Sequence, residues 1–236
     1  MTRPAWLARL ETGFIVALMT VAGGLFAFVR IADEVREGDT HGFDQWLLTL
    51  LRRPGDNAQP IGPWWLEQMM RDLTSLGGTT VLTLIVVVAV GYLAMDRKRG
   101  AAVLLVLAAG GGMLLSSVLK LGFDRPRPDL VAHLVDVRTL SFPSGHAMLS
   151  AVTYLTIGVM LARTTTRRAV KLYVVGVCVL LTLAIGSSRV YLGVHWPTDV
   201  LAGWSVGAAW AMLCWMVAVW LQRRGAVEPP GGAPGS

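Results

Sequence analysis

Charged residues are scarce in this sequence. Asp, Glu, Lys and Arg make up 15% of the 236 residues, whereas soluble domains carry roughly 25%. A globule built from this chain could not cover its surface with polar groups, which excludes an ordinary soluble protein. The chain also has too little charge to be disordered, and it lacks the repeats of collagen-like and coiled-coil proteins.

Cysteine is also rare. Cys178 and Cys214 are the only two, and both lie within apolar stretches. Neither a disulfide framework nor a zinc site can be built from them, so we interpret both as small buried hydrophobic residues.

Hydrophobic residues are abundant instead. They make up 54% of the chain, and the mean hydropathy is +0.56. Six apolar stretches approach the roughly 20 residues that cross a bilayer as a helix. They are Gly13–Ile31, Leu76–Met95, Ala101–Leu121, Ser144–Ala162, Leu172–Ser188 and Thr198–Leu221. The sequence therefore predicts an all-α integral membrane protein with six transmembrane helices in a single domain, residues 1–225. The Pro- and Gly-rich residues 226–236 are expected to form a disordered tail.

The net charge of +6 does not indicate a nucleic-acid partner, because the basic residues form short clusters between apolar stretches. Clusters of this kind lie on the cytoplasmic side of a membrane. They predict a multi-pass protein of the plasma (inner) membrane with both termini in the cytoplasm. A cleaved signal peptide at the first stretch is the alternative, but no clear A-x-A site follows it. The clusters are Arg3 and Arg9; Arg97, Lys98 and Arg99; Arg163, Arg167, Arg168 and Lys171; and Arg223 and Arg224.

Residues 32–75 form the long first loop. Apolar residues recur at helical spacing around Trp46 and, less regularly, around Trp65. Such helices lie in the membrane interface with tryptophans at headgroup depth. The loop is either a structural cover over the spans or a surface that guides a lipid substrate.

Three short blocks carry the chemically informative residues. On the topology above, all three reach the outer face of the membrane. They are Lys120 to Pro128, Pro143 to His146, and Ser188 to Asp199.

Lys120, Arg127 and Arg189 place three cations close to the hydrocarbon boundary, where an unpaired charge is costly. Each could snorkel or pair with an acid, and together they could instead clamp a phosphate. The nearby acids are Asp124, Asp129 and Asp136.

The other two blocks add an anion site and a reactive histidine. Ser144 can cap the fourth span, whose first-turn N–H groups attract anions, and Gly145 lets an oxyanion approach the backbone. His195 and Asp199 are four residues apart, so the carboxylate can fix the imidazole tautomer and leave one nitrogen free to attack. The histidines lack metal-ligand spacing and three cations would repel a metal, so no metal or other cofactor is expected.

Together the blocks resemble the type 2 phosphatidic acid phosphatase superfamily, whose signature is K-x6-R-P, P-S-G-H and S-R-x5-H-x3-D. Every interval is met between residues 120 and 199. Of the two Arg-Pro pairs at residues 125–128, only Arg127 satisfies the six-residue gap after Lys120, so Arg125 is an additional arginine without an assigned role. The resemblance implies that His195 forms a phosphohistidine, that Asp199 orients it and that His146 protonates the leaving oxygen. It also implies that no metal takes part. The residues that it implies for binding the phosphoryl oxygens are Lys120, Arg127, Ser144, Gly145 and Arg189.

The function expected from this resemblance is hydrolysis of a lipid phosphate or diphosphate at the outer face. The substrates that it allows are undecaprenyl diphosphate, phosphatidylglycerophosphate, phosphatidate and lipid A phosphates. Two alternatives remain: phosphotransfer to another lipid, and a non-catalytic phospholipid-binding or transporting protein. The intact His146, His195 and Asp199 argue against the last, since binding alone needs no nucleophile.

Overall fold

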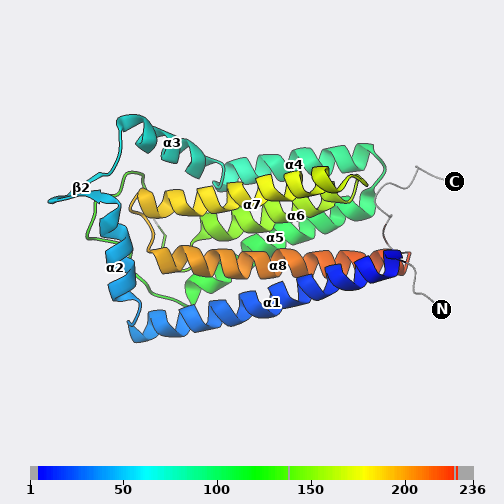
Figure 1. Cartoon of the computed structure of the whole chain (residues 1–236), viewed down its shortest axis with the longest axis horizontal. Helices are drawn as coiled ribbons and strands as arrows, with labels where there is room; N and C mark the ends of the chain where they lie inside the picture. The colour runs from blue at the N-terminus through cyan, green and yellow to red at the C-terminus, as the bar shows by residue number, and fades with distance from the viewer. Residues whose placement is uncertain (1–4, 138, 226, 228–236) are drawn as a thin grey trace.

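The computed structural model describes residues 5–137, 139–225 and 227. A bundle of long helices carries a smaller cap at one end (Figure 1). The helices are α1 (Ala5–Glu37), α2 (His41–Leu50), α3 (Trp64–Ser75), α4 (Thr79–Met95), α5 (Arg99–Leu121), α6 (Gly145–Ala162), α7 (Arg168–Tyr191) and α8 (Pro197–Arg223). The predicted tail lies outside the described residues except for Val227.

Five described helices are long and apolar enough to cross a bilayer: α1, α5, α6, α7 and α8. A sixth span arises if α3 and α4 are taken together, because they form one apolar path that bends by 50° at a short break. By itself, α4 has 17 residues and is slightly too short to count as a span. The predicted all-α membrane fold is thereby confirmed, with a bent second span.

Several helix ends differ from the bounds of the apolar stretches. The second span was expected to begin at Leu76, but α4 begins at Thr79, after the break that follows α3. The fifth span was expected from Leu172 to Ser188, but α7 begins at Arg168 and ends at Tyr191. Backbone hydrogen bonding continues through polar residues at the membrane boundary, where hydropathy already falls.

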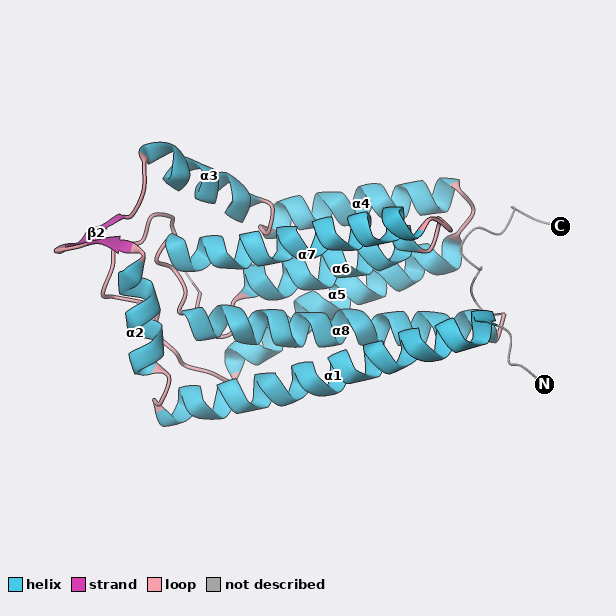
Figure 2. Ribbon diagram, viewed as in Figure 1, coloured by secondary structure: helices cyan, strands magenta, loops and turns pink. Residues whose placement is uncertain are grey.

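The first loop contains the two expected helices and a small hairpin that was not predicted. Strands β1 (Arg52–Arg53) and β2 (Asp56–Pro60) pair antiparallel beyond α2 (Figure 2). Gly55 has a φ of +82° at the hairpin turn, a conformation that glycine adopts without steric cost. The Pro54-Gly55 pair was the available signal.

Close helix contacts set the shape of the bundle. On α8, an added Cβ would lie 2.7 Å from the Ser144 carbonyl oxygen at Gly203, and 2.6 Å from the Met148 oxygen at Gly207. These glycines let α8 pack directly against the backbone of α6. On α5, Gly111 leaves room for the indole ring of Trp210 of α8. Small residues therefore allow close approach, as in other membrane helix pairs.

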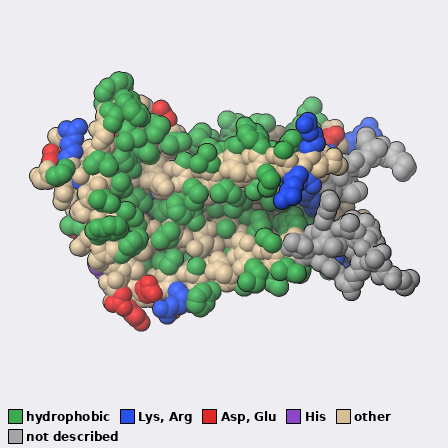
Figure 3. All heavy atoms as spheres, viewed as in Figure 1, with side chains coloured by type: hydrophobic (Ala, Val, Ile, Leu, Met, Phe, Trp, Pro, Cys, Tyr) green, Lys and Arg blue, Asp and Glu red, His purple; other side chains and the backbone are tan. Residues whose placement is uncertain are grey.

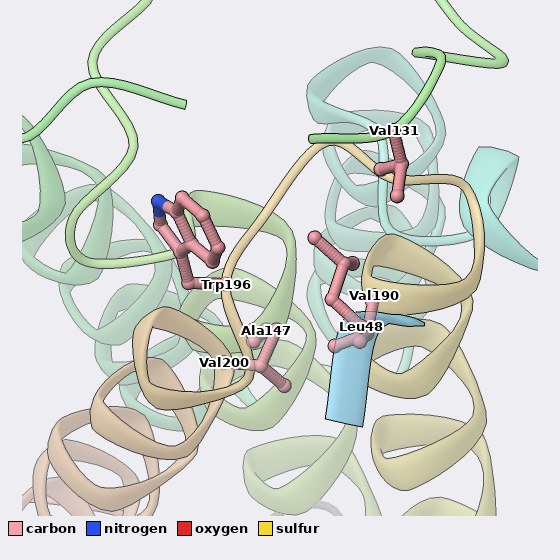
Figure 4. Close-up of a cluster of buried hydrophobic side chains, with 6 residues drawn as sticks. All are labelled: Leu48, Val131, Ala147, Val190, Trp196 and Val200. Carbon is pink, nitrogen blue, oxygen red and sulfur yellow. The ribbon is translucent and has the colours of Figure 1, made fainter. Parts of the chain in front are cut away.

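On the face shown in Figure 3, hydrophobic side chains are spread along the bundle and the charged side chains lie towards its two ends, as a bilayer requires. A buried apolar cluster lies at the capped end, where α2 meets the spans (Figure 4). Its members are Leu48, Val131, Ala147, Val190, Trp196 and Val200. This cluster gives the adjoining polar residues a rigid base.

Candidate active site

The three sequence blocks meet at the capped end of the bundle. Lys120 and Arg189 lie in the last turns of α5 and α7. Ser144 and His146 lie at the start of α6, and His195 lies just before α8. The helices thus bring together residues that are up to 79 positions apart in the 120–199 region.

His195 contacts a buried carboxylate through one ring nitrogen. Its Nδ1 is 3.4 Å from Asp199 Oδ2, and the same oxygen accepts hydrogen bonds from the Ser141 hydroxyl and the Trp196 amide. Because Asp199 occupies the first turn of α8, the helix start and the histidine share one carboxylate. The contact expected from the four-residue spacing is present.

The other ring nitrogen of His195 faces a cation. Arg127 Nη1 is 3.3 Å from His195 Nε2 and also donates to the Val194 carbonyl oxygen. Arg127 Nε donates to the Thr139 carbonyl oxygen at 2.7 Å, which fixes the guanidinium plane. An attacking Nε2 would therefore meet phosphorus beside a guanidinium.

Burial keeps the His195 imidazole neutral. The residue is 2% exposed, and this loss of solvation lowers its pKa to about 3, against the opposing pull of Asp199. A neutral imidazole retains the lone pair that a nucleophile needs. The histidine is therefore in its reactive form at neutral pH.

Two further cations border the same space. Lys120 Nζ donates to the Leu140 carbonyl oxygen at 2.8 Å, and Arg189 Nη1 donates to Thr74 Oγ1 at 2.9 Å. Among the described residues, no carboxylate oxygen lies within 4.0 Å of the nitrogens of Lys120, Arg127 or Arg189. Pairing with neighbouring acids, the alternative left open by the sequence, is therefore not how the structure holds these charges.

Two polar atoms at the site are buried without a partner in the described chain: Ser144 Oγ and Arg189 Nε. Ser144 occupies the N-cap position of α6 as expected, yet its hydroxyl makes no capping hydrogen bond. Ser144 is therefore the N-cap residue, as predicted, but the prediction that its side chain caps the helix is wrong. Buried donors normally have partners, so the hydroxyl and the guanidinium are free to bind an oxyanion.

His146 and Gly145 lie beside these groups. His146 interacts electrostatically with Arg189 and His195, and Gly77, at the α3–α4 bend, approaches its ring. The Cβ that Gly145 lacks would lie 3.6 Å from Lys120 Cε. All eight candidate residues are thus at one end of the molecule, around one polar centre.

Sequence reasoning missed four residues that hold this centre. Arg125, left without a role, donates to Asp199 Oδ1 at 2.6 Å and to Asp44 Oδ2 at 2.6 Å. Asp44 also accepts from the Thr198 amide at 2.9 Å. Ser141 and Thr74 complete the set of four. Arg125 lies within the Lys120–Pro128 block and Ser141 lies two residues before the Pro-Ser-Gly-His block, whereas no motif stands next to Asp44 or Thr74.

The first loop therefore contributes to the site. Asp44 of α2 and Thr74 of α3 each bind a residue of the polar centre's framework, Arg125 and Arg189 respectively. Among the described residues, no group of three or more His, Cys, Asp or Glu side chains is arranged to hold a metal ion. The arrangement suits nucleophilic attack on a phosphoryl group held by cations.

Comparison with known proteins identifies the family. The model of the PAP2 superfamily matches residues 101–223, about half of the chain. The chain belongs to the PAP2 superfamily. This membership confirms the resemblance drawn from the three blocks, and with it the interpretation of the chain as a membrane-embedded lipid phosphate hydrolase.

Individual PAP2 proteins agree with this assignment. Phosphatidylglycerophosphatase B of Bacillus subtilis is 39% identical over 148 residues, which span 61% of this chain and 70% of that protein. Decaprenylphosphoryl-5-phosphoribose phosphatase of Mycobacterium tuberculosis is 32% identical over 127 residues, or 52% of this chain and 65% of that one. The crystal structure of a transmembrane PAP2-type phosphatidylglycerolphosphate phosphatase from Bacillus subtilis superposes with a TM-score of 0.76. It is 30% identical and covers 87% of this chain and 98% of its own.

Proposed function

We propose that this protein hydrolyses lipid phosphates through a phosphohistidine at His195. The supporting observation is the pair of contacts on one imidazole: Nδ1 faces Asp199, and Nε2 faces Arg127. An imidazole that only filled space would not need a carboxylate on one nitrogen and a phosphate-binding cation at the other.

The reaction proceeds in two steps. The Nε2 lone pair of His195 attacks phosphorus, the bond from phosphorus to the lipid oxygen breaks, and His146, which takes up a proton when the anionic phosphate binds beside it, gives that oxygen its proton. Water then attacks the phosphohistidine while neutral His146 takes a proton from it, which releases phosphate and restores both histidines. Lys120, Arg127 and Arg189, with Ser144 and the Gly145 amide, stabilise the charge on the equatorial oxygens.

The active site is proposed to lie on the extracytoplasmic face, with both termini in the cytoplasm. The asymmetry of the short basic connections supports this orientation. The apolar sides of the bundle would hold the lipid tail in the bilayer while the phosphate enters the polar centre. Similar proteins are named for phosphatidylglycerophosphate, for a decaprenyl phosphoribose phosphate and for undecaprenyl diphosphate, so we propose a lipid phosphate or diphosphate as substrate.

Phosphate release by the purified protein in detergent tests the activity. The panel contains phosphatidylglycerophosphate, phosphatidate, undecaprenyl diphosphate and a lipid A phosphate, with His195→Ala as control. We expect release that survives excess EDTA and is inhibited by vanadate, a mimic of the pentacoordinate transition state. Loss of activity on chelation, with rescue by a divalent ion, would contradict the mechanism. Transfer of labelled phosphate to an added lipid alcohol in place of water would identify a phosphotransferase.

Cysteine labelling tests the orientation. In a Cys178→Ala, Cys214→Ala background, a cysteine at the exposed Asn57 or Asp124 should react with an impermeant thiol reagent on intact cells. A cysteine at the exposed Arg167 should react only after lysis. If only the Arg167→Cys variant were labelled on intact cells, the protein would have the opposite orientation in the membrane.

A further inference from the structure

A cavity, termed the inner cavity below, lies at the end of the helix bundle opposite the candidate active site. It has a volume of about 440 Å³ and is bordered by α4, α5, α6 and α8. On the side nearer the active site, α5 packs closely against its neighbours, since Gly112 contacts Val152 of α6. Beyond that contact the inner cavity opens towards the helix ends, and its volume falls in the range of small-molecule sites.

The walls of the inner cavity are suited to hydrocarbon. Its deep lining is mostly aliphatic, with Leu105 and Ala108 of α5 facing Ile157 and Met160 of α6. Leu105 and Ala108 are almost fully buried. An apolar chain could occupy the aliphatic part of this space.

Two hydrogen-bond donors in this wall are buried without an acceptor in the described chain, Thr156 Oγ1 and Trp215 Nε1. Other hydroxyls within the helices, such as those of Ser117 and Thr182, donate to the carbonyl four residues earlier. The indoles of Trp204 and Trp210 likewise donate to carbonyls of neighbouring helices. Since buried donors are normally satisfied, the pair indicates a ligand with oxygen acceptors.

The mouth of the inner cavity is basic. Lys98 and Arg163 line it, at the start of α5 and the end of α6. Lys98 pairs with Asp96 at 2.6 Å, whereas Arg163 has no carboxylate within 4.0 Å in the described part of the chain. The half-buried guanidinium is therefore available to an anion that approaches from the membrane surface.

We infer that the inner cavity binds one anionic phospholipid. Its phosphate pairs with Arg163, its ester oxygens accept from Thr156 and Trp215, and one acyl chain lies between α5 and α6. Thr156 precedes Arg163 by seven residues, or about 10 Å along the helix, a span that an extended arginine and a glycerophosphate can bridge. The lipid belongs to the cytoplasmic leaflet if the proposed orientation holds, but the binding itself does not rest on the proposed phosphatase activity.

Lipid binding by the full-length protein in detergent micelles tests this inference. The probes are palmitoyl-oleoyl phosphatidylglycerol, which carries no phosphomonoester, and phosphatidylcholine with the same chains. Native mass spectrometry gives the number of lipids bound and the dissociation constant. We expect one tightly bound phosphatidylglycerol, weaker phosphatidylcholine, and about tenfold weaker phosphatidylglycerol in Arg163→Gln. The exposed neighbour Arg167→Gln is the matched control and should bind as the wild type does.

Two cavity variants locate the lipid. Ala218→Phe fills the inner cavity and should abolish binding, whereas Thr156→Val keeps the side-chain shape, removes one donor and should weaken it. If Ala218→Phe does not fold, Thr156→Val and Arg163→Gln decide the question. Equal affinity in all variants, equal affinity for both lipids, or displacement of phosphatidylglycerol by vanadate would overturn the inference. Loss of phosphatase activity with intact lipid binding would reject only the proposed function.

Discussion

Arg125 and Asp44 form a 2.6 Å ion pair that joins the loop after α5 to the interfacial helix α2. The Arg125 side chain is 10% exposed and that of Asp44 is fully buried. The other end of the same guanidinium contacts Asp199 at 2.6 Å. One buried cation therefore bridges the first loop and the carboxylate that faces His195.

The first prediction concerns this bridge. Asp44→Asn should lower the free energy of unfolding by about 1.5–3 kcal/mol, because it weakens the charged hydrogen bond to Arg125 while Asp199 still balances that buried cation. Chemical unfolding in mixed micelles measures the change. Asp72→Asn, the same substitution at an exposed site on α3, should alter stability by less than about 0.5 kcal/mol. If both substitutions changed the free energy of unfolding equally, the ion pair between Arg125 and Asp44 would not contribute to stability.

The second prediction concerns the orienting carboxylate. Asp199→Asn should lower kcat by about 10²–10⁴-fold, since an amide favours the wrong imidazole tautomer. Ser141→Ala keeps the carboxylate and removes one hydrogen bond to it, so its kcat should fall far less. Arg125→Gln controls for the lost ion pair, because it disrupts the bridge without removing the carboxylate. A kcat for Asp199→Asn no lower than that of Arg125→Gln would mean that the carboxylate acts only through the bridge.

The third prediction separates the two histidines. With nitrophenyl phosphate the leaving group needs no proton, so His146→Ala should still give a pre-steady-state burst of nitrophenol. His195→Ala should give none, because no phosphoenzyme can form. With a lipid substrate, whose alkoxide leaves poorly, His146→Ala should lose about 10²–10⁴-fold in rate. The opposite burst pattern would exchange the two roles.

The fourth prediction is a pH dependence of stability. Folding lowers the His195 pKa from 6.5 to about 3, so between these values the unfolded chain binds a proton that the folded chain does not. The contribution of His195 to stability therefore falls as the pH drops below 6.5, by about 1.4 kcal/mol per unit. The free energies of unfolding of the wild type and of His195→Gln are measured between pH 7 and pH 4. The difference between them should shrink by this amount for each pH unit. Parallel pH profiles would mean that His195 keeps its ordinary pKa.

The sequence was sufficient to predict the membrane fold and the family, because both depend on local patterns. Apolar length marks a membrane helix, and fixed intervals place Lys120, Ser144 and His195 on helix ends that meet. Asp44 could not be found this way. Its partner Arg125 is 81 residues away, and a single acid in an interfacial helix has no pattern of its own. The hydroxyl of Ser144 also escaped prediction, since its lack of a capping bond depends on tertiary packing.

The attachment of α2 and α3 to the polar centre has a consequence for biosynthesis. Chains emerge from the ribosome N-terminus first, so Asp44 and Thr74 are made before their partners Arg125 and Arg189. Until α5 and α7 have inserted, a carboxylate and a hydroxyl of the first loop must remain hydrated at the membrane surface. The cap can close only after α5, α7 and the start of α8 are in place, because Asp44 also accepts hydrogen bonds from Thr198.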